Sequence, residues 1–334
     1  MDPFINFQNV IANALQNNNS LKKAYVNEQF ENFNGRQKLF SLKDFDLQKS
    51  ALIISQDLIK IASEMGATPF TEQQIGHHPH FKHLKHTNNS ENHYIISVFI
   101  DVKGSSNLFK NYDNETVFII TNTIQLAAIS VCTLFGGFIQ RLEGDGLFVY
   151  FGGKGIEQSL ANIHCLTALS FFTYFVENDL KGLFEQNGIE RIKAKVGIDF
   201  GYDKDVLWAM AGVNDSSEIT TISLHTSLAS KMQKCAGSNE IIIGQNVVNV
   251  SKIDSSLLEI IPDKRYIYQI QEKGFNYTQY KFNWLNYLKS LKYIATDAYG
   301  KMKIKPQNQE KSYLIGKDSS SLQELASTNK PWQC

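Results

Sequence analysis

The sequence predicts an α/β (α+β) protein in which helices cover a mixed β-sheet, in the manner of a ferredoxin-like sandwich. Two observations favour this class. Between residues 93 and 250, apolar runs of strand length alternate with longer runs of helix length. Within the same stretch, two pairs of strand-like runs flank short turns that contain Gly and Asp, which predicts two β-hairpins inside the interleaved pattern.

Residues 1–90 are expected to form a helical N-terminal extension followed by a polar linker. Four apolar residues recur at helical spacing near the start: Phe4, Phe7, Ile11 and Leu15. A second helix is predicted from residue 44 to residue 65, with Gly66 as its C-cap. The run GHHPHFKHLKH follows. Imidazoles bind zinc and nickel, but a proline and lysines interrupt this run, which favours a polar connector over a metal site.

Residues 91–255 contain the predicted sheet. The strand HYIISVFIDV comes first, and one or two helices follow within SSNLFKNYDNETVFIITNTIQLAAISVCTLF. A hairpin is predicted at GFIQRLEGDGLFVYF and a long helix at IEQSLANIHCLTALSFFTYFVENDLKGLFEQ. A second hairpin is predicted at RIKAKVGIDFGYDKDVLWAMAG, followed by the helix TSLASKMQKCAG and the strand NEIIIG.

Residues 256–334 are expected to form a C-terminal extension. The aromatic-rich segment RYIYQIQEKGFNYTQYKFNWLNYL has enough apolar surface to pack on the preceding domain. Roughly the last 30 residues are rich in Gln, Ser, Asn and Lys and are expected to form a loose tail.

The composition restricts the classes of partner. Lys plus Arg equals Asp plus Glu, at 33 each, so the net charge gives no support to nucleic-acid binding. The N-terminus has no basic region followed by an apolar core, so no signal peptide is expected. Four widely spaced cysteines form no metal-ligand pair, and a reduced, cytoplasmic location is the default expectation.

One apolar stretch resembles a membrane span in composition. No charged residue occurs between Glu115 and Arg141. The stretch nevertheless carries several polar side chains: Thr121, Asn122, Thr123, Gln125 and Ser130. Since membrane spans are normally more uniformly apolar, a buried helix at the core or at a subunit interface is the expected structure, and no membrane partner is predicted.

Two aspartates stand where turns interrupt apolar strands. Asp101 ends the strand VFIDV and precedes a turn with Gly104, after which Ser105 and Ser106 open a helix whose free amides suit a phosphate. Asp145 stands between two glycines at the tip of the first hairpin, where a turn residue alone would also explain it. Two carboxylates that share two divalent ions about 3.5–4 Å apart are typical of phosphoryl transfer. The sequence therefore predicts that the hairpin tip lies alongside Asp101 and that both bind metal.

Four segments together resemble the class III nucleotide cyclase catalytic domains: FIDVKGSSNLF, GGFIQRLEGDGLFVYFG, KAKVGIDFGYDKDVLWAMAG and TTISLHTSLASKM. The resemblance covers about residues 93–250 and implies a class III cyclase sandwich. It implies that Asp101 and Asp145 are the metal-binding aspartates, with two Mn²⁺ or Mg²⁺ ions per site. Val102 or Ile100 would lend a backbone carbonyl.

The same resemblance implies a head-to-tail homodimer with active sites at the interface, in which one protomer brings the metals and the other the base-selecting and transition-state residues. Arg141 stands where adenylyl cyclases carry an adenine-reading lysine, and Thr220 stands at the second base-reading position. Ser227 and Lys231 replace the usual asparagine and arginine of the transition-state helix. A lysine supplies charge to the phosphate but lacks the guanidinium fork.

Arg141 also bears on the identity of the base. A guanidinium only donates hydrogen bonds, so it requires an acceptor such as uracil O4, cytosine N3 or O2, or guanine O6. This disfavours ATP and leaves UTP and CTP unseparated, with UTP the slightly preferred expectation.

The soluble cyclase domain, its helical extension and Arg141 together resemble the pyrimidine cyclases of bacterial Pycsar antiphage systems. That resemblance implies cyclic UMP or cyclic CMP made as a signal during infection and detected by a separate effector protein. Two alternatives stay open, an ordinary adenylyl or guanylyl cyclase and a catalytically inactive cyclase-like regulatory module. Ser227 and Lys231 favour the second alternative, whereas the retention of both aspartates opposes it.

Overall fold

The computed structural model describes residues 3–25, 54–70, 73–260, 267–297 and 302–305. The helices are α1 (Ile5–Tyr25), α3 (Gln56–Glu64), α4 (Asn114–Leu134), α5 (Gln158–Tyr174), α6 (Leu180–Gln186), α7 (Leu224–Cys235), α8 (Gln245–Ser251) and α9 (Trp284–Ser290). The strands are β1 (Ser90–Asn92), β2 (Ile95–Lys103), β3 (Gly137–Glu143), β4 (Gly146–Phe151), β5 (Lys193–Gly201), β6 (Leu207–Val213), β7 (Ser216–Ile222), β8 (Glu240–Gly244), β9 (Leu258–Ile260), β10 (Ile267–Ile270), β11 (Phe275–Phe282), β12 (Ile294–Thr296) and β13 (Met302–Ile304).

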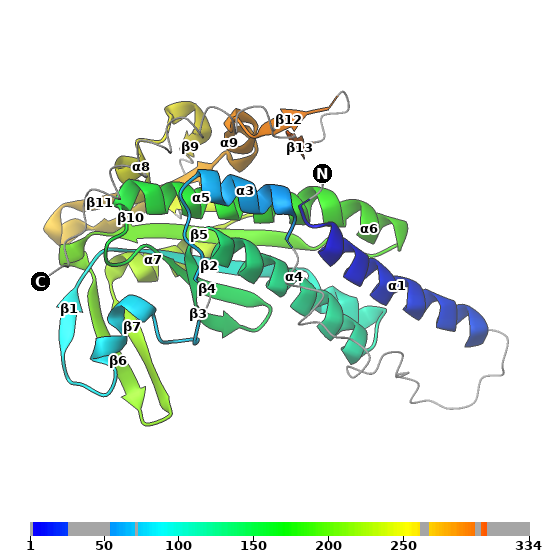
Figure 1. Cartoon of the computed structure of the whole chain (residues 1–334), viewed down its shortest axis with the longest axis horizontal. Helices are drawn as coiled ribbons and strands as arrows, with labels where there is room; N and C mark the ends of the chain where they lie inside the picture. The colour runs from blue at the N-terminus through cyan, green and yellow to red at the C-terminus, as the bar shows by residue number, and fades with distance from the viewer. Residues whose placement is uncertain (1–2, 26–53, 71–72, 261–266, 298–301, 306–334) are drawn as a thin grey trace, which may run out of the picture.

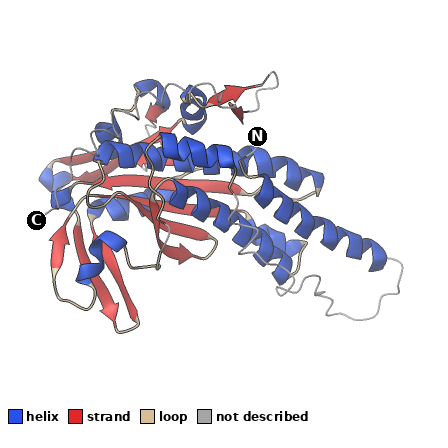
Figure 2. Cartoon of the chain, in the orientation of Figure 1, coloured by secondary structure: helices blue, strands red, loops and turns tan. Residues whose placement is uncertain are grey.

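The main sheet has the strand order β10-β11-β8-β5-β2-β4-β3, and β9 pairs with β11 off this path (Figures 1 and 2). Neighbouring strands run antiparallel except for β5 and β8, which are parallel. The predicted mixed sheet with helices packed on it is confirmed.

The two faces of the sheet follow from the alternation of side chains along β2. Ile96, Val98 and Ile100 belong to the main apolar core, which also contains the buried side of α4 and α5. Ser97, on the opposite face, forms a hydrogen bond with Thr226 of α7. Because successive side chains of a strand point to opposite faces, Asp101 lies on the same face as Ser97.

The N-terminal helices agree in part with the sequence prediction. Helix α1 forms as predicted and packs along α4 (Figure 1). The second helix begins only at Gln56, because the Ser55 side chain caps it by accepting a hydrogen bond from the backbone N–H of Leu58. Its predicted start at residue 44 was therefore wrong for Ile54 and Ser55, and residues 44–53 lie outside the described residues. Gly66 follows the last turn with a φ of +74°, as expected at this position.

The histidine-rich run is not the polar connector that was predicted. A short 3₁₀ helix, η1 (Pro79–Leu84), forms there, and its Phe81 and Leu84 are buried. Phe81 stacks on Trp208 with ring centroids 3.8 Å apart, and the fully buried His78 contacts the same cluster. His78, Phe81 and Leu84 are the buried members of this run, and they pack against the second apolar core, which contains Tyr150 and Trp208.

Burial of histidines predicts a stability that falls in acid. Burial and the nearby His80 and His93 hold the pKa of His78 well below its ordinary value. Burial likewise lowers the pKa of His164, whose Nε2–H donates to the carbonyl oxygen of Met65. As the pH falls, these histidines bind protons in the unfolded chain before they do so in the folded protein. The contribution of the neutral, buried histidines to the free energy of unfolding is therefore complete above about pH 6.5 and is lost as the pH falls through the folded-state pKa values.

We therefore expect the thermal unfolding midpoint to fall between pH 7.5 and pH 5.5, and His78→Asn to reduce that fall. Asparagine keeps an acceptor for the backbone N–H of His80, which His78 Nδ1 holds at 3.3 Å, but it does not titrate. The check is calorimetry of both proteins at the two pH values. An unchanged pH dependence in the variant would contradict the assignment.

Two helices pass the length and composition test for a membrane span among the residues that the structure describes. They are Asn114–Leu134 and the continuous helical segment Gln158–Gln186. The fold buries 56% of the apolar window of the first and 83% of that of the second. Helix α4 packs on α1, α5 and β3, which is the position expected of a core helix.

The second predicted hairpin was wrong. Strand β5 lies between β2 and β8 in the main sheet, so neither of its edges is available to β6. Strand β6 instead pairs with β7 and β1 in a separate three-stranded sheet, which projects from the body (Figure 1). Trp208 of β6 is fully buried against Phe81 and Tyr150, and this second core holds the projecting sheet in place.

The aromatic-rich C-terminal segment packs on the domain and also adds strands to its main sheet. Its strands β10 and β11 extend the main sheet, and β11 pairs with β8 from Gln279 opposite Gly244 to Phe282 opposite Ile241. The predicted loose tail after residue 305 lies outside the described residues.

Candidate active site

The structure places Asp101 and Asp145 at the same end of two paired strands. Ile100 of β2 pairs with Leu147 of β4, so that Asp101 comes beside Gly146, the residue after Asp145. A Cβ atom at Gly146 would clash with the carbonyl oxygen of Ile100 and would lie 3.5 Å from the Cα atom of Asp101. Only glycine allows this approach, which brings the hairpin tip against the end of β2.

The buried side-chain amide of Gln125 fixes the hairpin tip. Gln125 of α4 donates from Nε2 to the carbonyl oxygens of Gly144 at 3.0 Å and Gly146 at 2.9 Å. Gly144 has a φ of +63°, which supplies the left-handed turn. In the sequence, Gln125 counts only as one of the polar residues that oppose a membrane span. The sequence does not distinguish Gln125 from Asn122 in the same apolar stretch, and only its burial in the fold shows its role.

Asp145 carries an unsatisfied carboxylate oxygen. Its Oδ2 atom is buried and has no hydrogen-bond partner. A buried carboxylate oxygen without a partner is costly, and an ion is one of the few explanations for it. Lys195, which is directly opposite Asp101 on β5, donates its ammonium to the carbonyl oxygen of Lys234 rather than neutralising Asp101. The two aspartates therefore fit a divalent cation, whose preferred ligands are carboxylate and carbonyl oxygens.

The described residues contain no cluster of three or more His, Cys, Asp or Glu side chains that could hold a metal. A metal ion bound by the two aspartates would therefore need further ligands that are not side chains, such as backbone carbonyl oxygens. The Val102 carbonyl oxygen accepts a hydrogen bond from Ser105 Oγ at 3.3 Å, so it lies at the same turn.

The turn after β2 is built around Gly104. This residue has a φ of +98° and is the N-cap of a short 3₁₀ helix, η2 (Ser105–Lys110). A Cβ atom there would lie 3.2 Å from the carbonyl oxygen of Arg191. Ser106 is exposed beside it. The helix predicted to start here therefore does, although it is a single short 3₁₀ element.

Arg141 is held by a residue that sequence analysis missed. Its Nε donates to Glu218 Oε2 at 3.3 Å, and a terminal nitrogen pairs with Glu218 Oε1. Glu218 is on β7, two residues before the half-buried Thr220. The sequence carried no local signal for this pair, because the partners are 77 residues apart.

Ser227 and Lys231 lie one helical turn apart on the exposed side of α7. Ser227 Oγ donates to the carbonyl oxygen of Ser223 at 3.2 Å and lines an open pocket of about 510 Å³. The Lys231 ammonium lies 5.0 Å from the centre of the Tyr268 ring on β10.

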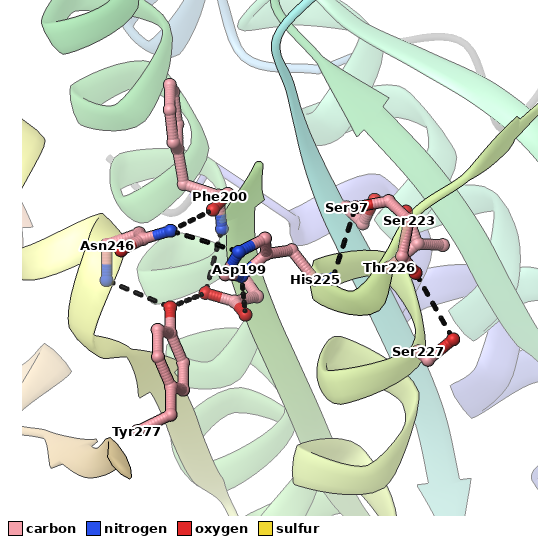
Figure 3. Close-up of polar contacts among 9 residues, drawn as sticks. All are labelled: Ser97, Asp199, Phe200, Ser223, His225, Thr226, Ser227, Asn246 and Tyr277. Atoms are coloured by element: carbon pink, nitrogen blue, oxygen red, sulfur yellow. Dashed lines mark hydrogen bonds and ion pairs between the residues drawn. The ribbon is translucent and has the colours of Figure 1, made fainter. Parts of the chain in front are cut away.

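A buried polar network anchors the first turn of α7 (Figure 3). Asp199 of β5 is fully buried and accepts from His225 Nδ1 at 2.9 Å and from the Tyr277 hydroxyl at 2.5 Å. Asn246 completes the network by donating to the carbonyl oxygen of Phe200 at 2.9 Å. Burial raises the pKa of Asp199, and burial together with Asp199 raises that of Tyr277. All of these polar atoms are satisfied inside the fold, so the network positions α7 and presents no free nucleophile.

A chain of hydroxyl groups makes a second attachment of α7. Thr226 contacts Ser97 of β2 at 2.8 Å, as Figure 3 shows, and Thr221 of β7 at 3.0 Å. Thr221 in turn contacts the hydroxyl of Tyr150 at 2.9 Å, and burial raises the pKa of Tyr150 to about 12. The chain links β2, α7, β7 and β4 in one hydrogen-bonded unit.

Within one chain, the candidate residues lie on different strands and helices. Asp101 and Asp145 lie at the β2–β4 end, whereas Lys231 faces β10, at the opposite edge of the sheet order from β3. Arg141 lies on β3 and contacts the projecting sheet.

A cytidylate cyclase of Staphylococcus aureus is 36% identical over 261 residues, which cover 76% of this chain and 60% of that protein. A cytidylate cyclase of Escherichia coli is 30% identical over 312 residues, covering 89% of this chain and 65% of that protein. The chain is thus similar, over most of its length, to two proteins named cytidylate cyclase.

The chain spans less than two thirds of the length of these two relatives. Among solved structures, the adenylyl cyclase CyaB from P. aeruginosa matches with a TM-score of 0.46 at 19% identity, over 58% of this chain and 95% of that chain. No protein-family model matches the chain.

Proposed function

We propose that this protein is a metal-dependent nucleotide cyclase that converts a pyrimidine nucleoside triphosphate, CTP in preference to UTP, to its 3′,5′-cyclic monophosphate and diphosphate. The observation that carries the proposal is the buried, unpaired Oδ2 of Asp145 beside Asp101 at the glycine-lined end of β2 and β4. The similarity to two cytidylate cyclases supports it.

In the proposed reaction, the ribose 3′-hydroxyl loses its proton to water and its oxygen attacks the α-phosphorus; the bond from that phosphorus to the bridging oxygen breaks, and diphosphate leaves. Asp101 and Asp145 would bind two Mg²⁺ or Mn²⁺ ions, with the Val102 carbonyl as a further oxygen ligand. Such ions, when bound, lower the pKa of the attacking hydroxyl and offset the charge of the phosphates.

The chain's own residues would orient the substrate. The turn of Gly104, Ser105 and Ser106 would face the phosphates, with Gly104 allowing close approach of the backbone. Gln125 would hold the turn that carries Asp145 in one geometry, since it bonds to carbonyl oxygens on both sides of it.

A homodimer would complete the site. The Lys231 ammonium lies over the Tyr268 ring of β10, which β11, β8 and β5 separate from β2 in the sheet order. In the proposed head-to-tail dimer, Ser227 and Lys231 of one protomer would meet the phosphates bound at the aspartates of the other. Lys231 would supply positive charge to the phosphorus at which negative charge develops.

Arg141 and Thr220 are proposed to contact the base. The sequence alone slightly preferred UTP, but the names of both relatives favour CTP, and we adopt CTP here. We further propose a cytoplasmic enzyme whose product acts as an antiphage signal on a separate effector protein.

The test is incubation of the purified protein with Mn²⁺ and each of ATP, GTP, CTP and UTP, with products identified by chromatography and mass spectrometry. Cyclic CMP as the main product is the expected result. Cyclic AMP or cyclic GMP as the main product would overturn the pyrimidine assignment. Absence of a cyclic product from all four nucleotides would favour the inactive regulatory module, to which the replacements Ser227 and Lys231 would then belong.

A further inference from the structure

Hydrogen bonds of the neighbouring residues Gln140 and Ile219 hold the ion pair between Arg141 and Glu218 in place. The neighbouring Gln140 donates from Nε2 to the carbonyl oxygen of Ile219 at 3.0 Å, so β3 and β7 are tied next to the pair. The backbone N–H of Ile219 donates to the carbonyl oxygen of Gly76 at 2.7 Å. A Cβ atom at Gly76 would lie 3.0 Å from Glu218 Cβ. Glu218 is thus held where it meets the guanidinium.

The pair offers hydrogen-bond donors and acceptors side by side. Arg141 uses Nε and one terminal nitrogen on Glu218, which leaves further N–H groups of its five donors. Glu218 has about four lone-pair positions and uses two of them on Arg141. The carboxylate accepts hydrogen bonds and cannot donate them when ionised. A base bound here therefore meets an acceptor beside a donor.

The side chains of Arg141 and Glu218 differ in how far they are buried. The Arg141 side chain is 47% exposed, whereas that of Glu218 is 22% exposed. In a pyrimidine nucleotide, O2 is next to the ribose and the 4-substituent is at the far edge of the ring. A base that enters with its far edge first presents the 4-substituent to the deeper Glu218, and N3 and O2 to Arg141.

We propose that Glu218 is a specificity-determining residue that selects cytosine over uracil. Cytosine carries a donor amine at position 4, which the carboxylate accepts, and N3 and O2 are acceptors for the guanidinium. Uracil carries a carbonyl oxygen at position 4, which the carboxylate repels. The inference rests on the proposed cyclase function and adds to it the residue that distinguishes CTP from UTP.

The experiment compares kcat/KM for CTP and UTP in the unaltered protein and in Glu218→Gln. Glutamine keeps an oxygen for Arg141 and adds an N–H donor that uracil O4 accepts. We expect the CTP-to-UTP ratio to fall by about 10- to 100-fold, as when one hydrogen bond to a charged group is lost. Glu185→Gln is the matched control, because it alters another surface Arg–Glu pair, with Arg191, and should leave the ratio unchanged.

A parallel binding measurement separates this inference from the proposed function. The thermal midpoint is recorded with Ca²⁺ and either CTP or UTP, for both the unaltered protein and Glu218→Gln. A larger stabilisation by CTP that disappears in the variant supports the inference even without turnover. If the variant loses CTP and UTP turnover or binding equally, Glu218 only braces Arg141 and the inference is overturned, whereas the cyclase function stands. No cyclic product from the unaltered protein overturns the proposed function, and the binding ratio still decides the role of Glu218.

Discussion

Replacing Asp145 with asparagine is expected to abolish cyclisation almost completely while stabilising the metal-free protein. Removal of one preorganised charge-stabilising group commonly costs about 10²–10³ in rate, and the loss of a metal ligand should reach at least this range. The same change removes negative charge from the buried, unpaired Oδ2 atom, so the free energy of unfolding without metal should rise by about 1 kcal/mol. Product formation from CTP and calorimetry in a chelator measure the two effects.

Asp215→Asn is the matched control, because Asp215 is also at the tip of a hairpin, between β6 and β7, but is exposed. It should change neither quantity. The Mn²⁺-induced shift of the unfolding midpoint gives a readout independent of turnover, and it should shrink in Asp145→Asn alone. If Asp145→Asn retained most of the activity or the full Mn²⁺ response, the assignment of Asp145 as a metal ligand would be wrong.

Gly197→Ala is expected to destabilise the protein by about 3 kcal/mol, at the upper end of the cost of overpacking. Gly197 is on β5, and a Cβ atom there would overlap the carbonyl oxygen of Ala229 and the backbone nitrogen of Gln233 on α7. These are main-chain atoms, so relief requires α7 to move away from the sheet. That movement would disturb the His225–Asp199 contact and displace Ser227 and Lys231, and cyclase activity should fall with stability.

Gly182→Ala is also a glycine-to-alanine substitution, but it is expected to raise the free energy of unfolding. Gly182 lies inside α6, and a Cβ atom there would have no neighbour within 4 Å. Alanine should stabilise this helix by about 0.5–1 kcal/mol. Chemical denaturation of both variants measures the contrast. Equal free energies of unfolding for Gly197→Ala and the unaltered protein would show that α7 does not pack on Gly197 as described.

The local features of the fold were predictable because their causes are local. Apolar runs of strand length define β2 and the β3–β4 hairpin, and the glycines around Asp145 define its turn. The placement of Asp145 beside Asp101 was also predictable, because a hairpin that joins a mixed sheet can pair with only a few strand edges, and β4 pairs with β2. The predicted helix was wrong at Ile54 and Ser55 because the apolar repeat includes Ile54, whereas the Ser55 side chain caps a helix that begins at Gln56.

The sequence by itself determined the elements, the two aspartates and the turns that present them, because spacing and turn chemistry act within a few residues. Only the tertiary structure decided that β6 leaves β5 for a separate sheet, that Gln125 supports the hairpin tip and that Glu218 meets Arg141. The physical reason is common to all three. Each depends on which strand edge is already occupied, or on which distant side chain packing brings within hydrogen-bond reach, and neither is encoded in the propensity of the residues nearby.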